Sequence, residues 1–359
     1  MKRILISVTN DLATDQRVHK VCETLQEFGF EILLIGRKLP NSLPVNRNYK
    51  TTRMNLIFNK GFLFYTEYNL RLFLKLLFTK KDILLANDLD TLLPNFLISR
   101  IQNTKLVYDS HELFTEVPEL INRPKVQSVW LRIEKTILPK LKNCYTVCQS
   151  ISDYYNTKYD TSFKVIKNLP IKSELSEKKL IENDEKKIIY QGALNLGRGI
   201  ELMIESMQYL ENTKFIIVGN GDISTELKQK VEELKFQNKV QFLGRKSPDE
   251  LKDITLQADL GISFEEDLGL NYRYALPNKV FDYINAEIPI LVSDLPEMKR
   301  IVNDYLVGEV IVEREPKLIA QQIQDIFKKD YKEMIIKAKN ELNWSTEKEK
   351  LKTIFHLIS

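Results

Sequence analysis

Short apolar runs recur along the whole chain, and segments with helical spacing separate them. The runs are apolar throughout, as expected of strands that are buried on both faces of a parallel sheet. Between the first two runs, Val18, Val21 and Leu25 lie on one face of a predicted helix at 15–28. This alternation predicts an α/β protein with doubly wound parallel sheets. The runs cover residues 3–8, 31–36, 82–86, 105–108, 144–147 and 164–166, then 187–192, 214–219, 240–244, 259–264, 288–293 and 308–312.

A polar, charged stretch near 170–186 divides these runs into two series. An open twisted sheet rarely exceeds about ten strands, so the number of runs favours two domains over one large sheet. We therefore predict two Rossmann-like domains, at 1–170 and 171–342, and a C-terminal helix at 343–359 that can pack back on the first. Such domains bind ligands at the carboxyl ends of their strands. If those ends face each other, the ligand lies in a cleft between the domains.

The net charge of +4 hides a difference between the two halves. Residues 1–170 contain 25 Lys and Arg and 16 Asp and Glu, whereas residues 171–359 contain 28 and 33. The basic first half indicates an anionic partner, such as a membrane surface or a phosphorylated acceptor. No nucleic-acid motif accompanies the charge, so we expect no nucleic-acid partner.

Several features favour a cytoplasmic protein. No apolar stretch reaches the roughly 18–20 residues that a membrane-spanning helix needs. The basic and apolar N-terminus meets Asn10 and Asp11 too early for a signal peptide. Cys22, Cys144 and Cys148 lack metal-ligand spacing, so we expect buried free thiols.

The segment at 60–81 leaves two interpretations open. It is rich in Phe, Leu and Tyr and carries five Lys or Arg. A basic amphipathic helix of this kind can lie in a membrane interface. The alternative is a core helix of the first domain with a basic outer side.

Glycine-lined turns follow three successive runs of the second half. The first turn surrounds Arg198 and precedes a predicted helix. Backbone N–H groups and the helix dipole favour an anion there, and an arginine can bridge a diphosphate. An ordinary turn with an exposed arginine would look the same. The glycines of these turns are Gly192, Gly197, Gly199, Gly219 and Gly244, and backbone groups at Gly244 and Arg245 could receive a flat base.

The stretch at 259–298 holds a candidate for hydroxyl binding. Asn278 begins a predicted helix, and Asp282 lies one turn further along it. A carboxylate there can accept hydrogen bonds from two neighbouring hydroxyls, as on a ribose. The alternative is that Asp282 only interacts with the helix dipole.

Taken in order over about residues 186–300, these motifs resemble the donor-binding half of retaining GT-B glycosyltransferases. The similarity is to the family 4 type, within the glycosyl transferases group 1. The first half is similar at Asp15, Arg17 and Val18, which match a D-x-R-V pattern, and at two further segments, 106–114 and 168–170.

The resemblance implies a nucleotide-sugar bound by the second domain and a saccharide or lipid-linked acceptor bound by the first. Arg198 would bind the diphosphate and Asp282 the ribose. Ala193 stands where the family has the first of two basic residues, and Tyr274 stands where it has one of two glutamates. The further positions expected to meet the sugar or the distal phosphate are Glu265 or Glu266, Gly269, Leu270 and Asn271.

The resemblance also implies a mechanism. A retaining enzyme without two carboxylates about 5 Å apart cannot easily form a covalent intermediate, so the acceptor attacks from the face that the diphosphate leaves. Arg198 and Lys279 would stabilise the departing diphosphate, and His111 would contact the donor sugar. We expect no metal and no other cofactor. The side chains expected on the acceptor side are Arg17, Asp88, Asp109 and Glu112.

The sequence thus predicts a metal-independent, retaining hexosyl-type glycosyltransferase for cell-surface polysaccharide or glycolipid assembly. Peripheral contact with an anionic surface, at the inner face of the cell membrane, is left open. Two other functions are also open. One is a nucleotide-sugar epimerase or hydrolase of GT-B fold, and the other is a non-catalytic nucleotide-sugar binding protein, which Ala193 and Tyr274 make conceivable.

Overall fold

The computed structural model describes residues 1–13, 15–172 and 185–358. The chain divides into two compact units, the second of which takes Leu169–Thr346 and the first of which takes the remainder. The boundary expected from the sequence was at 170–171. Most of the polar stretch that suggested it, residues 173–184, lies outside the described residues.

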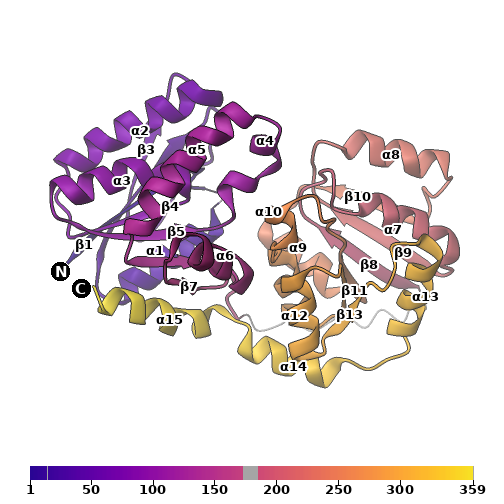
Figure 1. The fold of residues 1–359 in the computed structure, drawn as a ribbon. Coiled ribbons are helices and arrows are strands. Elements are labelled where there is room, and N and C mark those ends of the chain that lie inside the picture. Colours follow the sequence, from indigo (N-terminus) through magenta and orange to yellow (C-terminus); the bar gives the residue numbers. More distant parts are fainter. Residues whose placement is uncertain (14, 173–184, 359) are drawn as a thin grey trace. The chain divides into compact units, whose positions relative to one another are not determined.

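In its described part, the first unit contains a seven-stranded parallel sheet in the order β3-β2-β1-β4-β5-β6-β7 (Figure 1). Helices lie on both faces of this sheet (Figure 1). The strands are β1 (Arg3–Asp11), β2 (Glu31–Lys38), β3 (Lys50–Asn55), β4 (Ile83–Asn87), β5 (Lys105–Ser110), β6 (Asn143–Thr146) and β7 (Phe163–Val165). The helices are α1 (Gln16–Glu27), α2 (Gly61–Phe78), α3 (Leu89–Ile101), α4 (Pro118–Ile121), α5 (Pro124–Ile137), α6 (Gln149–Tyr159) and most of α15 (Trp344–His356).

The described part of the second unit contains a six-stranded parallel sheet in the order β10-β9-β8-β11-β12-β13. Its strands are β8 (Lys186–Gln191), β9 (Thr213–Val218), β10 (Val240–Gly244), β11 (Leu260–Ser263), β12 (Ile290–Val292) and β13 (Gly308–Val310). Its helices are α7 (Ile200–Ser206), α8 (Ser224–Glu233), α9 (Pro248–Leu256), α10 (Leu270–Arg273), α11 (Asn278–Asn285), α12 (Pro296–Tyr305), α13 (Pro316–Ile326) and α14 (Lys332–Glu341). Neighbouring residues of β8 point to opposite faces, so Ile188 packs in one core cluster and Ile189 in the other.

These two parallel-sheet units confirm the predicted α/β class. Among the described strands, the apolar runs missed β3, at the edge of the first sheet. Its sequence, KTTRMN, is polar and none of its residues is fully buried. An edge strand that is partly exposed does not need the continuous apolar run of a strand covered on both faces.

The α2 helix has an apolar inner face and an apolar outer face. Phe64, Tyr68, Leu72 and Leu76 are buried, so the core interpretation of this segment is confirmed for the inner face. The outer face carries apolar side chains that are 47–82% exposed, Phe62, Leu63, Leu70, Leu74 and Phe78. In the described part of the chain, every helix is too short or too polar to cross a bilayer.

Helix α15 begins in the second unit and continues in the first. The backbone N–H of Trp344 donates to the carbonyl of Pro170 in the second unit, at 2.8 Å. From Glu347 onward the helix belongs to the first unit, where Lys348 forms an ion pair with Glu27 at 2.7 Å. Phe355 is buried there against Phe30, with 6.2 Å between the ring centroids.

Candidate active site

The carboxyl ends of the strands carry the candidate residues of both units. In the second unit the turns after β8, β9 and β10 contain Gly192, Gly219 and Gly244. These turns pack backbone against backbone, because a Cβ on Gly219 would lie 1.8 Å from the carbonyl oxygen of Gly192. The N–H of Gly219 donates to the carbonyl of Gly244 at 2.9 Å. Side chains are therefore excluded where the turns meet.

Three charged side chains of the second unit form one cluster, which we call the Glu265 cluster. The Glu265 carboxylate is completely buried directly after β11. Lys279, from the first turn of α11, lies 2.8 Å from Glu265 Oε1, and Arg198 lies 3.5 Å from the same atom. Ser263 donates a hydrogen bond to Oε2 at 2.6 Å. Two cations thus share one carboxylate, which leaves a net positive charge.

The ionisation states in the Glu265 cluster follow from these contacts. Burial alone would raise the pKa of Glu265, but the charges of Lys279 and Arg198 and the Ser263 hydrogen bond lower it. Burial also lowers the pKa of Lys279, against the attraction of Glu265. Aromatic rings lie against both cations: Tyr190 is 4.0 Å from Lys279 and Tyr272 is 5.3 Å from Arg198.

A fourth charged residue beside the cluster had no sequence signal. Arg314, in the segment between β13 and α13, donates to the carbonyl of Phe264 at 2.9 Å and to Ser293 Oγ at 3.1 Å. Its guanidinium is 3.6 Å from Glu266, a residue that is more exposed than Glu265. A Cβ on Gly199 would come within 3.0 Å of the Arg314 guanidinium, so the arginine lies against the Arg198 turn.

Asp282 lies one helical turn after Lys279 on α11 and is held by a buried glutamine. Gln191, the last residue of β8, donates from Nε2 to Asp282 Oδ2 at 2.9 Å. The Gln191 carbonyl oxygen accepts from Thr255 at 2.8 Å. No motif pointed to Gln191 or Thr255, which are 91 and 27 residues away from Asp282 along the chain. Only the fold brings them together.

The other residues that the sequence predicts for the donor site lie in the Arg198 turn, in α10 and α11, and after β10. The carbonyl of Gly197 accepts from the Glu266 N–H at 2.9 Å, which ties the Arg198 turn to the segment after β11. Gly269 precedes α10, which contains Leu270 and Asn271, and Asn278 begins α11. Arg245 is exposed after β10 and is not one of the residues that form ion pairs with Glu265 in the described part of the chain.

The first unit places Arg17, Asp88, Asp109 and His111 in one network, which we call the His111 cluster. Arg17, on α1, makes two hydrogen bonds to the buried Asp109 carboxylate, at 2.8 and 3.1 Å. The His111 ring lies between two carboxylates, with Nδ1 3.1 Å from Asp88 and Nε2 3.1 Å from Asp109. Glu112 follows His111, and its backbone carbonyl accepts from Ser110 at 2.8 Å.

His111 is a cation in this arrangement. Burial alone would lower the pKa of its imidazole, but Asp88 and Asp109 outweigh burial and raise the pKa well above its ordinary value. Both ring nitrogens carry protons that point at carboxylates, so His111 supplies positive charge and cannot accept a proton. Asp88 adopts φ 58°, a left-handed backbone that costs an aspartate about 1–3 kcal/mol. In this conformation both carboxylate oxygens of Asp88 contact His111, one at Nδ1 and one at the backbone N–H.

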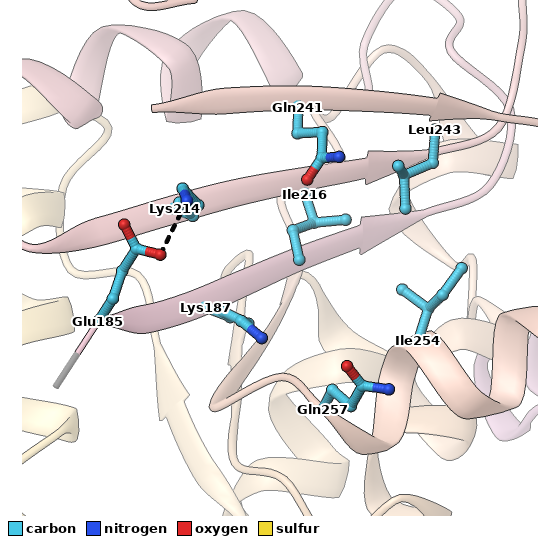
Figure 2. Close-up of a pocket in the computed structure, with 8 residues that line it drawn as sticks. All are labelled: Glu185, Lys187, Lys214, Ile216, Gln241, Leu243, Ile254 and Gln257. Atoms are coloured by element: carbon cyan, nitrogen blue, oxygen red, sulfur yellow. Dashed lines mark ion pairs between the residues drawn. The ribbon is translucent and has the colours of Figure 1, made fainter. Parts of the chain in front are cut away.

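Two further observations concern a pocket of the second unit and the possibility of a metal site. The second unit has a pocket of about 330 Å³, and its lining includes the apolar residues Ile216, Leu243 and Ile254 (Figure 2). Glu185 and Lys214, which also line it, form an ion pair at 3.0 Å. The pocket is lined by none of the predicted site residues. Among residues 1–13, 15–172 and 185–358, no three His, Cys, Asp or Glu side chains are arranged to hold a metal.

The family model named Glycosyl transferases group 1 matches residues 171–341, nearly the whole second unit. An uncharacterized glycosyltransferase of Methanocaldococcus jannaschii is 29% identical over 39% of this chain and 35% of its own length. The chitobiosyldiphosphodolichol beta-mannosyltransferase of Candida albicans is 25% identical over 64% of this chain and 56% of its own. The chain thus spans about a third to a half of these curated relatives. The matches support a relationship to group 1 glycosyltransferases.

Two solved structures resemble the whole chain. The sucrose-phosphate synthase of Thermosynechococcus elongatus has a TM-score of 0.81 at 14% identity and covers 100% of this chain and 99% of its own. Anabaena HepE, solved with UDP and glucose, has a TM-score of 0.74 at 13% identity and covers 99% and 100%. At such identities the likeness establishes the fold, which is GT-B, as the sequence predicted.

Asp90 gives the first unit a testable pH dependence. Burial, with Asp88 nearby, raises the pKa of Asp90 to about 8. Between roughly pH 4 and 8 the folded state therefore keeps a proton that the unfolded state releases, so Asp90 lowers the free energy of unfolding by about 1.4 kcal/mol per pH unit as pH rises. Asp90→Asn retains an acceptor for Thr9 Oγ1 and should be more stable than the wild type at pH 9 and similar at pH 5. Thermal melts at both pH values, with the exposed Asp153→Asn as control, measure this; parallel pH profiles of wild type and variant would contradict it.

Proposed function

We propose that this chain transfers a sugar from a nucleotide-diphosphate-sugar to an acceptor hydroxyl, with retention of configuration at the anomeric carbon. The observation that carries the proposal is the Glu265 cluster, where Arg198 and Lys279 share one carboxylate and leave a positive charge beside the glycine-lined turns. A diphosphate leaving group needs such a charge. The match to group 1 glycosyltransferases and the UDP bound by HepE support a nucleotide-sugar donor.

In this proposal the two basic side chains divide the work that a basic pair performs in the resembled family. Arg198, whose side chain is about a quarter exposed, contacts the diphosphate. Lys279, whose side chain is almost fully buried, contributes its positive charge without being exposed to solvent. Lys279 thereby substitutes for the first basic residue of the family, whose position is occupied by Ala193 in this chain. Stabilisation comes from side-chain cations, and the proposal needs no metal or other cofactor.

Asp282 is the proposed ribose ligand, and the exposed Glu266 is the better of two candidates for the sugar. Gln191 holds one Asp282 oxygen, so the orientation of the carboxylate is fixed before a ligand arrives. Glu265 already faces Lys279 and Arg198, whereas Glu266 is 43% exposed at its side chain. Backbone N–H groups around Gly269 would complete the contacts to the distal phosphate and sugar.

The His111 cluster is the proposed acceptor side. Because His111 holds a positive charge and two donated hydrogen bonds, we assign it an orienting and charge-stabilising role toward the sugar. It is not the base, since both its ring nitrogens are occupied. The leaving phosphate would take the acceptor proton.

We further propose a hexosyl donor and an acceptor that is lipid-linked, in polysaccharide or glycolipid assembly at the inner face of the cell membrane. The outer face of α2 supports this, because five exposed Phe and Leu residues face outward from a helix flanked by lysines. The Candida albicans relative is, by its name, a mannosyltransferase that acts on a diphosphodolichol. Both curated relatives are named as transferases, which favours transfer over isomerisation, hydrolysis or binding alone.

Arg198→Ala tests the proposal most directly. Loss of one preorganised charge should cost about 2–4 kcal/mol of transition-state stabilisation, a fall of roughly 30- to 1,000-fold in kcat/KM. Lys279 and Ser263 still contact Glu265 in this variant, so the protein should still fold, and its melting temperature is measured alongside its activity. The donor is first found by thermal stabilisation with a panel of nucleotide-sugars. Lys299→Ala, which removes an exposed charge from the same unit, is the control; turnover close to wild type in Arg198→Ala would reject the role.

Asp282→Asn tests the ribose contact. The amide keeps the shape of the side chain but loses the charge, so nucleoside diphosphate should bind about 1–3 kcal/mol more weakly. Calorimetry measures the affinity, and the exposed Asp294→Asn is the matched control. Equal affinities for wild type and Asp282→Asn would place the ribose elsewhere.

The double variant Leu70→Gln and Leu74→Gln tests the membrane contact of α2. Both side chains are exposed, so stability should be kept while sedimentation with anionic vesicles falls by roughly tenfold or more. Binding of the wild type should also weaken with salt, because charges are screened beyond about 8 Å at physiological ionic strength. Leu76→Gln, at a fully buried position, should instead lower the melting temperature. A wild-type protein that stays in the supernatant at low salt would show that α2 has no membrane role.

A further inference from the structure

A second anion site is suggested by a pocket in the first unit. This pocket, of about 360 Å³, lies at the amino-terminal ends of β5 and β6. The His111 cluster lies at the opposite, carboxyl ends of the strands, so the two sites are distinct within the unit. The last turn of α3, the loop that follows it and the segment before β6 line the pocket. Its volume is in the range of small-ligand sites, about 300–1,000 Å³.

All the charged residues that line this pocket are basic. Its lining includes four cations, Arg100, Lys105, Lys140 and Lys142, and no acidic residue. Within the described ranges, none of these four forms an ion pair. Lys105 donates a hydrogen bond to the backbone carbonyl of Ile358, so one of the four cations already has a hydrogen-bond partner in the protein. Like charges gathered in a hollow focus a positive potential into it.

The end of helix α3 accounts for only part of this charge. A cation near a helix C-terminus is stabilised by the helix dipole, and Arg100 is the basic residue of the last turn of α3. Lys140 and Lys142 come from a different segment, before β6. Lys105, Lys140 and Lys142 add three further positive charges around the same hollow, and a bound anion would reduce their mutual repulsion. The excess therefore points to a ligand.

The other lining groups suit a phosphate. Phe96 lies under the cations, with its ring centroid 5.1 Å from the Arg100 guanidinium and 5.9 Å from the Lys140 ammonium. It thereby holds two charges at the pocket wall. Asn103 and Thr104 add uncharged donors. An arginine fork, lysine point charges and neutral donors are the usual set that binds phosphate oxygens.

We propose that this basic pocket binds a phosphate group, at a site separate from that of the nucleotide-sugar and independent of glycosyl transfer. Two carriers present the same chemistry, a lipid head group and a soluble phosphate ester. The surroundings favour the lipid, because Leu97 and Ile101 are 42% and 63% exposed on the same helix as Phe96 and Arg100. A head group in the pocket would bring these apolar side chains to the acyl boundary.

The test compares two pairs of substitutions in the full chain. Arg100→Ala with Lys142→Ala removes two exposed charges from the pocket, and Lys2→Ala with Lys164→Ala removes two exposed charges elsewhere in the same unit. Each protein is sedimented with phosphatidylglycerol vesicles and with phosphatidylcholine vesicles, and is titrated with glycerol phosphate by calorimetry. The wild type and the control pair should bind phosphatidylglycerol alike. The pocket pair should bind roughly 10- to 30-fold more weakly, the effect of two basic residues near an anionic surface.

The possible results distinguish a lipid carrier of the phosphate from a soluble one, and two of them would overturn the proposal. Binding of glycerol phosphate as tight as binding of vesicles, and lost in the pocket pair, supports the phosphate site and identifies the carrier as soluble. Equal losses in the pocket pair and the control pair would show that net charge alone is responsible, and would overturn the proposal. So would a wild type that binds neither probe. Because the α2 side chains and the Glu265 cluster are intact in the pocket pair, failure here leaves the proposed transferase activity untouched.

Discussion

The second unit is organised around the burial of one charge, the carboxylate of Glu265. An ionised carboxylate that leaves water loses several kcal/mol unless cations and hydrogen bonds replace its hydration. Here the replacements come from three directions: Lys279 from α11, Arg198 from the turn after β8, and Ser263 from β11. One interaction therefore fixes the helix, the turn and the strand end relative to one another. It also leaves the surplus positive charge on which the proposed donor site depends.

The fold could be predicted largely because most of its strands are covered on both faces. Such strands must be apolar along their length, so the apolar runs found every strand of the second unit's described sheet and all but β3 of the first. β3 was missed because an exposed edge strand tolerates polar residues. The outer face of α2 was visible as a surplus of apolar residues, but only the structure showed which side chains the core leaves exposed.

The candidate site could be predicted where its residues follow a strand or begin a helix. Arg198, Asp282 and His111 occupy such positions, and sequence motifs mark them. Their partners could not be predicted in the same way, since they depend on which strands are neighbours. Gln191 reaches Asp282 only because β8 ends beside α11, and Arg314 lies in a segment with no motif at all. The sequence therefore marks the proposed ligand-binding side chains more readily than the side chains that hold them in place.

The strained backbone of Asp88 limits how the first unit can evolve. A glycine at this position would adopt φ 58° without penalty, and selection for stability alone would favour it. The same replacement would remove an oxygen from beside Nδ1 of His111 and another from its backbone N–H, which Asp88 accepts at 2.8 Å. The imidazolium would then lose half of the negative charge that keeps it protonated. Positions 88 and 111 are thus expected to vary together across homologues, with an acid at one wherever a histidine stands at the other.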